Sequence, residues 1–283
     1  QLRRWCYPDA AACRRNAGLA RNGLSAVTPD WNAPWLVSHQ PLAQAVHAAW
    51  QARGDLAAAL NGFPQQAGVR FVPQAALPEG VAYEQFIFDT LQVPTRDNLH
   101  DYFNGLMWLQ FPRAKRRLNL LQAGELARLG GVGAQRGPLR DALTLFDENV
   151  ALFRGPEVLW QALAHKRWQE LFVQERALWA ACDILLFGHA LLEQLVQPFK
   201  SITAHVYRVP EQMPAVGSPD WQAAWDDWLA QDLGESALVP KPYVHLPVLG
   251  VPGWWQDNSD ADFYDDVTVF RPLRRPPPAK FTN

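Results

Sequence analysis

One segment combines an aromatic core pattern with several polar side chains, and it strongly constrains the fold. It covers residues 95–119 and reads TRDNLHDYFNGLMWLQFPRAKRRLN. Asp97 is a good cap for a helix from Asn98 to Gln110. Pro112 suits the first turn of a second helix, because proline lacks an N–H that would be unpaired there. Polar groups among rings need partners, since an unpaired buried polar group costs roughly 1–3 kcal/mol. The segment therefore predicts where a site lies.

The other patterns predict a single, mainly helical α+β domain with a few short strands. The chain has 283 residues, of which 48% are hydrophobic, so a sizeable core can form. Residues 142–153 read ALTLFDENVALF, in which two β-prone runs flank a polar turn, and this predicts a hairpin. Lys115 is expected on the solvent side of its helix. We expect residues 1–283 to form one domain, with a flexible proline-rich tail over residues 273–283.

Charge and cysteine usage narrow the classes of partner. The net charge is −2 and the basic residues are scattered, so nucleic acid is a weak candidate. Three cysteines without a Cys-x-x-Cys spacing argue against a disulfide framework or a cysteine-based zinc site. No stretch reaches the ~18 apolar residues of a membrane span, and no signal peptide is visible, which favours a cytoplasmic protein. The sequence leaves the oligomeric state open.

The chain contains thirteen tryptophans, which is an unusually high number. Three of them, Trp221, Trp225 and Trp228, follow a helix start at i, i+4 and i+7. This stripe favours a core face. The alternative is an exposed docking face of a binding or scaffold protein.

His100 and Asn104 are the first candidate site residues. They are four apart, so they project from one face of the predicted helix. Asp101 lies one residue round that helix. It can serve the site, or it can stabilise the helix N-terminus electrostatically.

A second candidate pair is His189 and Glu193, again four residues apart and directly after Gly188. A helix can present such a pair to a metal ion, or the glutamate can orient the histidine as a general base. Ordinary helices also carry such pairs. Asp141 and Asp147 can divide acid and base roles or bind a hard cation, or they can be ordinary turn and ion-pair residues.

Common catalytic signatures are missing from the sequence. It has no G-x-S-x-G, G-x-x-x-x-G-K-[ST], G-x-G-x-x-G or H-E-x-x-H motif, which weakens serine hydrolases, P-loop enzymes, Rossmann dehydrogenases and zincins. The turn-rich segment around Trp254 and Trp255 can line a cleft. It can equally be a loop pinned onto the core by these rings.

Four blocks resemble, in order, a bacterial domain-of-unknown-function family, the one numbered three thousand and twenty-five. The blocks are VPTRDNLHDYFNGLMWLQFPRAKRRLN, RDALTLFDENVALF, LLFGHALLEQL, and LPVLGVPGWWQDN with FYDDVTVFRP. The resemblance covers roughly residues 30 to 272. It implies a one-domain bacterial protein and brings no established activity, so no catalytic residue follows from it.

The leading hypothesis is a hydrolase that uses histidine and carboxylate groups, with or without a divalent metal ion, on a small-molecule or peptide ligand. The catalytic candidates are His100, Asp101, Asp147, His189 and Glu193. The substrate-binding candidates are Arg140, Asn104, Trp254 and Trp255. The alternative is a non-catalytic binding or scaffold protein with a tryptophan-rich surface. A third hypothesis, single-strand nucleic acid binding, relies on the basic run Arg113 to Arg117.

Overall fold

A computed structural model describes residues 28–130, 137–239 and 242–273. The predicted tail from residue 274 onward lies outside the described residues. The helices are α2 (Leu42–Arg53), α3 (Leu56–Leu60), α4 (Tyr83–Thr90), α5 (Leu99–Gln110), α6 (Pro112–Arg128), α7 (Pro138–Asn149), α8 (Glu157–Ala164), α9 (His189–Gln194), α10 (Trp221–Asp232) and α11 (Glu235–Leu238). Short 3₁₀ or π turns cover Pro34–His39, Gln74–Ala76, Glu170–Gln174, Arg176–Ala181, Val248–Gly250, Gln256–Ser259 and Ala261–Asp265.

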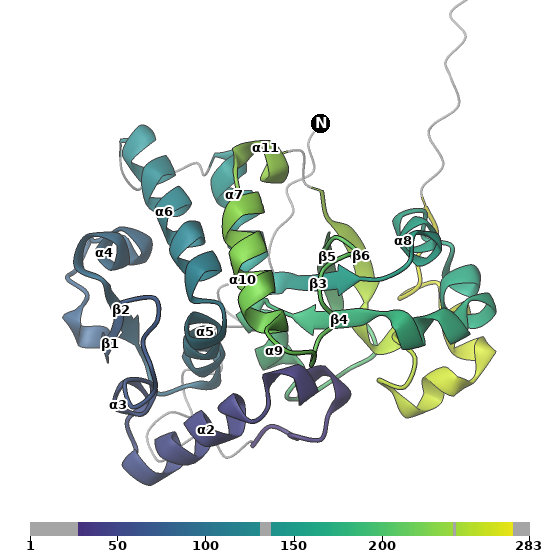
Figure 1. The fold of residues 1–283 in the computed structure, drawn as a ribbon, viewed down its shortest axis with the longest axis horizontal. Coiled ribbons are helices and arrows are strands. Elements are labelled where there is room, and N and C mark those ends of the chain that lie inside the picture. The colour runs from purple at the N-terminus through teal and green to yellow at the C-terminus, as the bar shows by residue number, and fades with distance from the viewer. Residues whose placement is uncertain (1–27, 131–136, 240–241, 274–283) are drawn as a thin grey trace, which may run out of the picture.

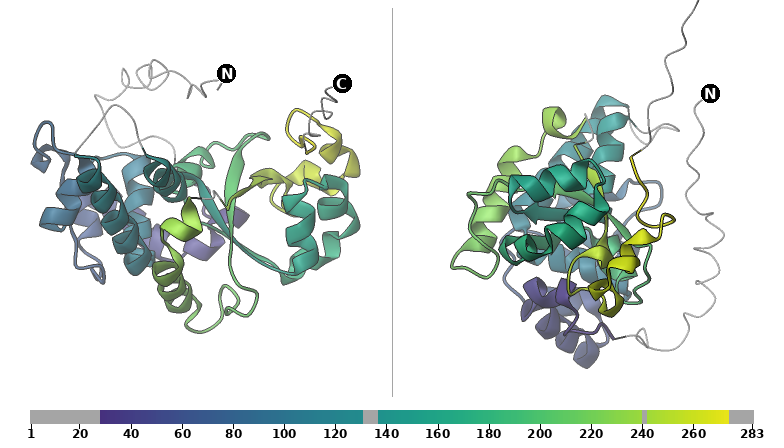
Figure 2. Two further views of the ribbon diagram at one scale, coloured as in Figure 1. Left: turned by 90° about the horizontal axis from the view of Figure 1, so that it is seen from above. Right: turned by 90° about the vertical axis from the view of Figure 1, so that its right-hand side faces the viewer.

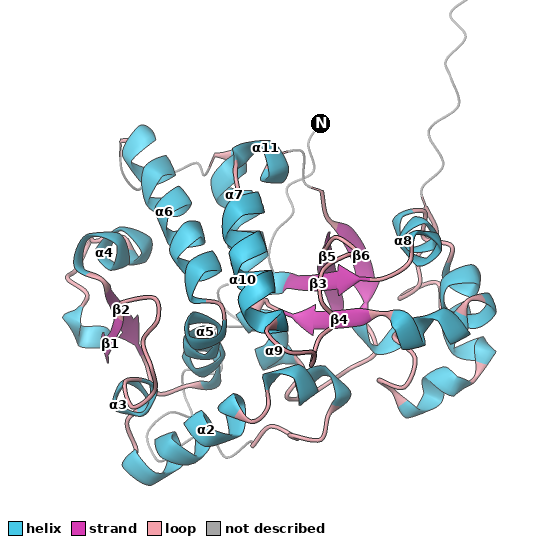
Figure 3. Cartoon of the chain, viewed as in Figure 1, coloured by secondary structure: helices cyan, strands magenta, loops and turns pink. Residues whose placement is uncertain are grey.

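The strands form two small sheets. The strands are β1 (Arg70–Pro73), β2 (Gln92–Thr95), β3 (Val150–Arg154), β4 (Asp183–Leu186), β5 (Thr203–Arg208) and β6 (Val244–Pro247). Strands β1 and β2 pair in parallel. The other four are ordered β4-β3-β5-β6, with β3 parallel to β5 and the outer pairs antiparallel. The predicted mainly helical α+β class is therefore confirmed (Figure 3).

The four-stranded sheet lies between two helical regions. Helices α4, α5 and α6 stand at one end of the molecule, while α8 and the C-terminal turns stand at the other (Figure 1). The view from above separates the same two regions (Figure 2). Helix α9 packs against both α5 and α7, so three helices from distant parts of the chain meet beside the sheet.

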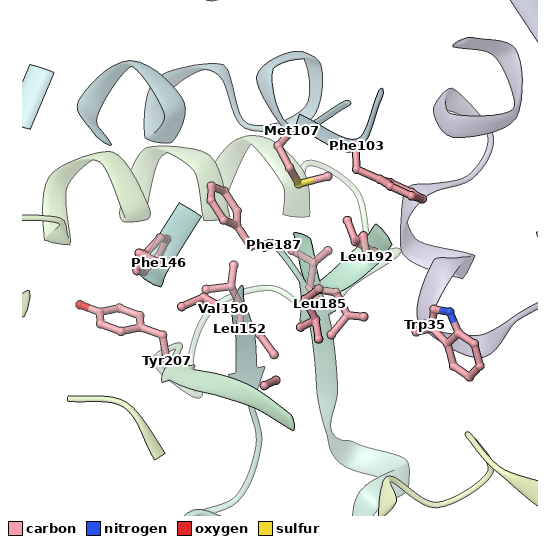
Figure 4. Packing of buried hydrophobic residues seen from close by; sticks show 14 of the residues in the cluster. Trp35, Phe103, Met107, Phe146, Val150, Leu152, Leu185, Phe187, Leu192 and Tyr207 are labelled. Carbon is pink, nitrogen blue, oxygen red and sulfur yellow. The ribbon is translucent and has the colours of Figure 1, made fainter. Parts of the chain in front are cut away.

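A continuous apolar cluster occupies the interface between these helices and the sheet. Strand β3 is central, and its first four residues, Val150 to Phe153, are fully buried, as expected of a strand covered on both faces. Phe146 of α7 lies edge-on to Phe187, with ring centroids 5.3 Å apart, and Met107 of α5 points into the same cluster (Figure 4). This packing fixes α5, α7 and α9 relative to one another.

The predicted hairpin at residues 142–153 is wrong. Residues up to Asn149 belong to helix α7, and β3 follows it directly. The buried side of α7 carries Leu139, Leu143 and Phe146, which recur at helical spacing, and Pro138 occupies the first turn. The residues after 142 are rich in β-prone side chains, so the sequence pattern did not reveal the helix, which begins earlier, at Pro138.

The segment at residues 95–119 forms the two helices predicted for it. Helix α5 begins one residue later than expected, because Asn98 is its cap and accepts a hydrogen bond from the Asp101 N–H. Asp97 instead accepts from Trp50 and from the backbone of Leu56. Its carboxylate thus ties α2 and α3 to the start of α5.

Candidate functional site

A cavity of about 300 Å³ opens where helices α4, α5, α7 and α9 meet, and we call it the main cavity. Its lining residues are Gln74, Leu77, Tyr83, Glu84, Arg96, His100, Asp101, Asn104, Gln122, Thr144, Asp147, Glu148 and His189. Four predicted catalytic residues and one predicted substrate-binding residue are among them. Segments more than eighty residues apart in the chain therefore contribute to one hollow.

Two histidines contact each other in the main cavity. Nε2 of His100 lies 3.1 Å from Nε2 of His189, with ring centroids 4.5 Å apart and the rings nearly perpendicular. On the far side of His100, Nδ1 lies 2.9 Å from a carboxylate oxygen of Glu193. Glu193 does not line the main cavity; it supports His100 from behind.

The backbone at the start of α9 fixes the position of His189. A Cβ on Gly188 would lie 2.5 Å from backbone atoms of Glu148 and Asn149, so the α7–β3 junction can approach only a glycine there. This close approach lets Nδ1 of His189 donate a hydrogen bond to the backbone oxygen of Asp147 at 2.7 Å. The ring is buried and held by that bond.

The partners of the two rings indicate where their protons lie. The Asp147 carbonyl can only accept, so Nδ1 of His189 carries the hydrogen. Burial lowers the pKa of His189 to about 3, despite the nearby Asp147 charge. The ring is therefore neutral at pH 7, and its Nε2 is a bare acceptor. His100 must then donate from its own Nε2.

His100 also faces a carboxylate at Nδ1, so it donates from both nitrogens and is an imidazolium. Burial opposes this charge, but the hydrogen bond and the negative charge of Glu193 outweigh burial and raise the pKa of His100. One cationic ring and one neutral ring thus share a single proton between their Nε2 atoms.

A buried ion pair lies beside the histidines. The Lys115 ammonium binds the Asp147 carboxylate and donates to Oδ1 of Asn104 at 2.9 Å. Burial alone would raise the pKa of the Asp147 carboxyl, but the charge and hydrogen bond of Lys115, together with the nearby histidines, outweigh burial and hold that pKa below its usual value. Asp147 is therefore a carboxylate at neutral pH.

Tyr83 extends this network to the wall formed by α4. Asn104 donates from Nδ2 to the Tyr83 hydroxyl at 3.1 Å. Burial and the negative charge of Asp101 raise the pKa of Tyr83 above its usual value. The phenol therefore stays protonated and remains a hydrogen-bond donor at the cavity wall.

Asp101 is held by Arg96 at the cavity mouth. The guanidinium of Arg96 contacts both carboxylate oxygens, and the Arg96 backbone N–H donates to one of them at 2.6 Å. Arg96 is half-exposed, whereas Asp101 is buried. The pair shapes the opening of the cavity and leaves Asp101 without proton-transfer contacts to the histidines.

The remaining candidates lie elsewhere. Arg140 is buried on α7 and does not line the main cavity. Trp254 lines a different cavity, and Trp255 donates to Asp257 in its own loop. The expectation that these two rings cover the cleft is wrong for the main cavity. Trp254 instead packs on Trp35, in the short turn Pro34–His39 that contacts strand β4.

The sequence predicts Lys115 on the solvent side of its helix, and this is wrong, because its side chain is only 3% exposed. Helix α6 packs against α4 on one side and α10 on another, so little of it faces water. A usable signal was present: Lys115, Asn119 and Gln122 recur at i, i+4 and i+7, which gives one polar face. The nucleic-acid hypothesis loses Lys115 as a phosphate contact for the same reason.

Within the described ranges, no group of three or more His, Cys, Asp and Glu side chains is arranged to hold a metal ion. Among the same residues, no helix is long and apolar enough to cross a bilayer.

Comparison with known proteins gives one match. A family model described as "Protein of unknown function (DUF3025)" matches residues 69–274, which is more than half of the chain. The match starts later than the resemblance noted above, which began near residue 30. No curated protein and no solved structure matches the chain. All residues that line the main cavity fall inside the matched range. Because the match covers more than half of the chain, the protein belongs to the DUF3025 family of proteins of unknown function.

Proposed function

We propose that this protein is a hydrolase that uses His100 and His189 as an acid–base pair on a small polar substrate. The observation that carries the proposal is the 3.1 Å contact between the two Nε2 atoms inside the main cavity, with Glu193 behind His100. Histidine is the side chain that most often transfers protons in catalysis, and a carboxylate behind it fixes the ring and its charge.

The proton balance of such a reaction needs no further donor. His100 gives its Nε2 proton to the leaving group as the substrate bond breaks, and both rings are then neutral. The two bare Nε2 atoms now face each other across 3.1 Å and repel, so they favour a proton donor between them. The attacking water supplies that proton, and the pair returns to its resting state. Overall, one water is consumed and one substrate bond is cleaved.

Neighbouring groups support this cycle in the proposal. Glu193 stabilises the imidazolium and holds Nδ1–H of His100 throughout. Asp147 holds His189 through its backbone oxygen, and Lys115 balances the charge of its carboxylate. Tyr83 supplies a fixed donor at the wall, which can stabilise negative charge that develops on the substrate.

The experiment is a hydrolysis screen with p-nitrophenyl esters, phosphates and glycosides. The proteins are the wild type, His100→Gln, His189→Asn and the exposed-ring control His165→Asn. We expect hydrolysis of at least one class, about 10²- to 10⁴-fold slower in the two cavity variants and unchanged in the control, as is typical for loss of a general acid or base. Activity that survives in folded His100→Gln would overturn the proposal.

Metal content is measured on the same samples. A stoichiometric metal ion in the wild type that is lost in His100→Gln and His189→Asn would show that the two rings bind a metal. The reaction would then be metal-assisted instead of relying on proton transfer between side chains. No metal would leave the acid–base cycle as proposed.

The alternative of a tryptophan-rich binding protein has weaker support. Trp225 is fully buried, so the three tryptophans of α10 do not form one exposed face. Trp221 and Trp254 do line a second cavity of about 660 Å³, beside the exposed Val37. Absence of hydrolysis in every class, together with a ligand whose binding is lost in Trp221→Ala, would favour this alternative.

A further inference from the structure

A small recess leads inward from the main cavity. It shares Tyr83, Glu84, Asn104, Gln122 and Asp147 with the main cavity, and Lys115, Asn119 and Trp108 form its inner wall. Its volume is about 30 Å³, which is room for two or three water molecules at about 10–15 Å³ each. A group of two non-hydrogen atoms fits there.

The polar face of α6 points into this recess with hydrogen-bonding capacity left over. Asn119 donates from Nδ2 to the backbone oxygen of Glu84, but its Oδ1 is buried without a partner. The residue is only 3% exposed. Gln122 is nine-tenths buried and makes no side-chain hydrogen bond within the described part of the chain. Lys115 uses two of its three N–H groups, on Asn104 and Asp147.

These unused groups specify the chemistry of an occupant. A buried carbonyl oxygen without a partner costs roughly 1–3 kcal/mol, so Oδ1 of Asn119 favours a group that donates. The third N–H of Lys115 favours a group that accepts. A hydroxyl does both. An ammonium group would lie against the Lys115 charge, and a carboxylate would lie against the oxygens of Asn119 and Asp147.

The charge of the main cavity points to a neutral molecule. Four acidic side chains line it, against Arg96 and His100, and Lys115 in the recess is the counter-charge of one of the acids, Asp147. All three cations are already paired, Arg96 with Asp101, His100 with Glu193 and Lys115 with Asp147. An anionic substrate would therefore meet excess negative charge and would find each of these cations engaged.

The inner wall also suits the carbon that carries a hydroxyl. Trp108 is buried and offers its ring to the recess, where the Lys115 ammonium already lies 5.4 Å from the ring centroid. Ile87 and Leu118 complete an apolar side. A hydroxymethyl group presents one CH₂ to such a wall and one hydroxyl to the amides.

We propose that the substrate is a neutral polyhydroxy compound of the sugar class, and that its hydroxymethyl group occupies this recess. The inference deepens the proposed function, because it names the substrate class of the same site. Asn119 and Gln122 are then specificity-determining residues, and the histidine pair lies further out, beside the bond to be cleaved.

The test uses matched sugars that differ in that one group. Methyl β-D-glucoside, methyl β-D-galactoside and methyl α-D-mannoside are compared with methyl β-D-xyloside, methyl α-L-arabinopyranoside and methyl α-D-lyxoside, which lack the hydroxymethyl group. Saturation-transfer NMR and calorimetry measure binding to the full chain, so no turnover is needed. We expect one hexoside to bind about tenfold or more tightly than its pentoside.

Variants locate the effect. Asn119→Leu should lower the affinity for that hexoside to the level of the pentoside and leave pentoside binding unchanged. Gln122→Leu replaces Asn119→Leu in this test if Asn119→Leu does not fold. The control is Gln231→Leu, which removes an exposed amide on α10. A recess that only holds water would show equal affinities within each pair, which would overturn the inference. Absence of hexoside binding, or tighter binding of the probes putrescine or inorganic phosphate, would also overturn it.

The two proposals fail in different ways. If a hexoside binds through Asn119 but no p-nitrophenyl ester, phosphate or glycoside is cleaved, the recess assignment stands and the hydrolase proposal falls. If an ester is cleaved in a His100-dependent way while no hexoside binds, the hydrolase proposal stands and the recess assignment falls.

Discussion

Acid should destabilise this fold through His189. Burial lowers the pKa of this ring from 6.5 to about 3 on folding. As the pH falls, His189 therefore takes up a proton in the unfolded chain at a higher pH than in the folded chain. The stability that the neutral ring contributes is complete above pH 6.5 and is lost as the pH falls towards 3. At pH 4.5, two pH units below the unfolded value, the loss is about 2–3 kcal/mol, because each pH unit is worth about 1.4 kcal/mol.

Guanidinium unfolding at pH 7.0 and 4.5 measures this effect, with wild type compared with His189→Asn. Other acids titrate in both proteins, so the difference between the two pH dependences isolates His189. His165→Asn, on an exposed ring, is the matched control. The same comparison in a His100→Gln background removes the contribution of His100 to the pH dependence of stability, which has the opposite sign to that of His189. The raised pKa of His100 adds stability below pH 6.5, which is lost as the pH rises through the folded pKa.

We expect the wild type to lose about 2–3 kcal/mol more than His189→Asn between the two pH values. An identical pH dependence in both proteins would refute the reasoning. It would mean that His189 accepts a proton as readily in the fold as in the unfolded chain, and that burial does not keep this ring neutral beside the charged His100.

Three further predictions concern the groups around the pair. Lys115→Met should cost about 3 kcal/mol of unfolding free energy, because it leaves the Asp147 carboxylate buried without its counter-charge. Lys115→Met with Asp147→Leu should recover most of that loss in urea unfolding, and strictly additive losses would show that the two residues are not coupled. Glu193→Gln should lower the pKa of His100, because it removes the charge that raises it; an NMR titration midpoint equal to that of wild type would contradict this. Gly188→Ala should cost about 1–3 kcal/mol, because its Cβ would lie 2.5 Å from backbone atoms, and a wild-type Tm would show that the backbone can move aside at no cost.

Local patterns predicted much of the helical structure and five of the residues that line the main cavity. Pro112 marks the start of α6 as expected, and the polar residues set among rings in α5 do meet partners from other elements. The i, i+4 spacing of His189 and Glu193 was informative because α9 is a helix, so both side chains reach His100 from one face. The identity of the partner elements required the fold.

Two errors have clear physical causes. The hairpin prediction began at Ala142 and so omitted Leu139, although Leu139, Leu143 and Phe146 form a helical stripe. Lys115 was assigned to solvent because it sits in a basic run, yet neighbouring basic residues on a helix point in different directions. Whether one of them meets a buried carboxylate depends on Asp147, thirty-two residues further along the chain.

The central claim is that the two histidines share one proton, with His100 charged and His189 neutral. Long-range ¹H–¹⁵N NMR spectra of the imidazole nitrogens at pH 7 test it directly. We predict protonated-type shifts for both nitrogens of His100, a protonated-type Nδ1 for His189 and an unprotonated Nε2 for His189. A neutral His100, or a His189 that carries its hydrogen on Nε2, would contradict the account.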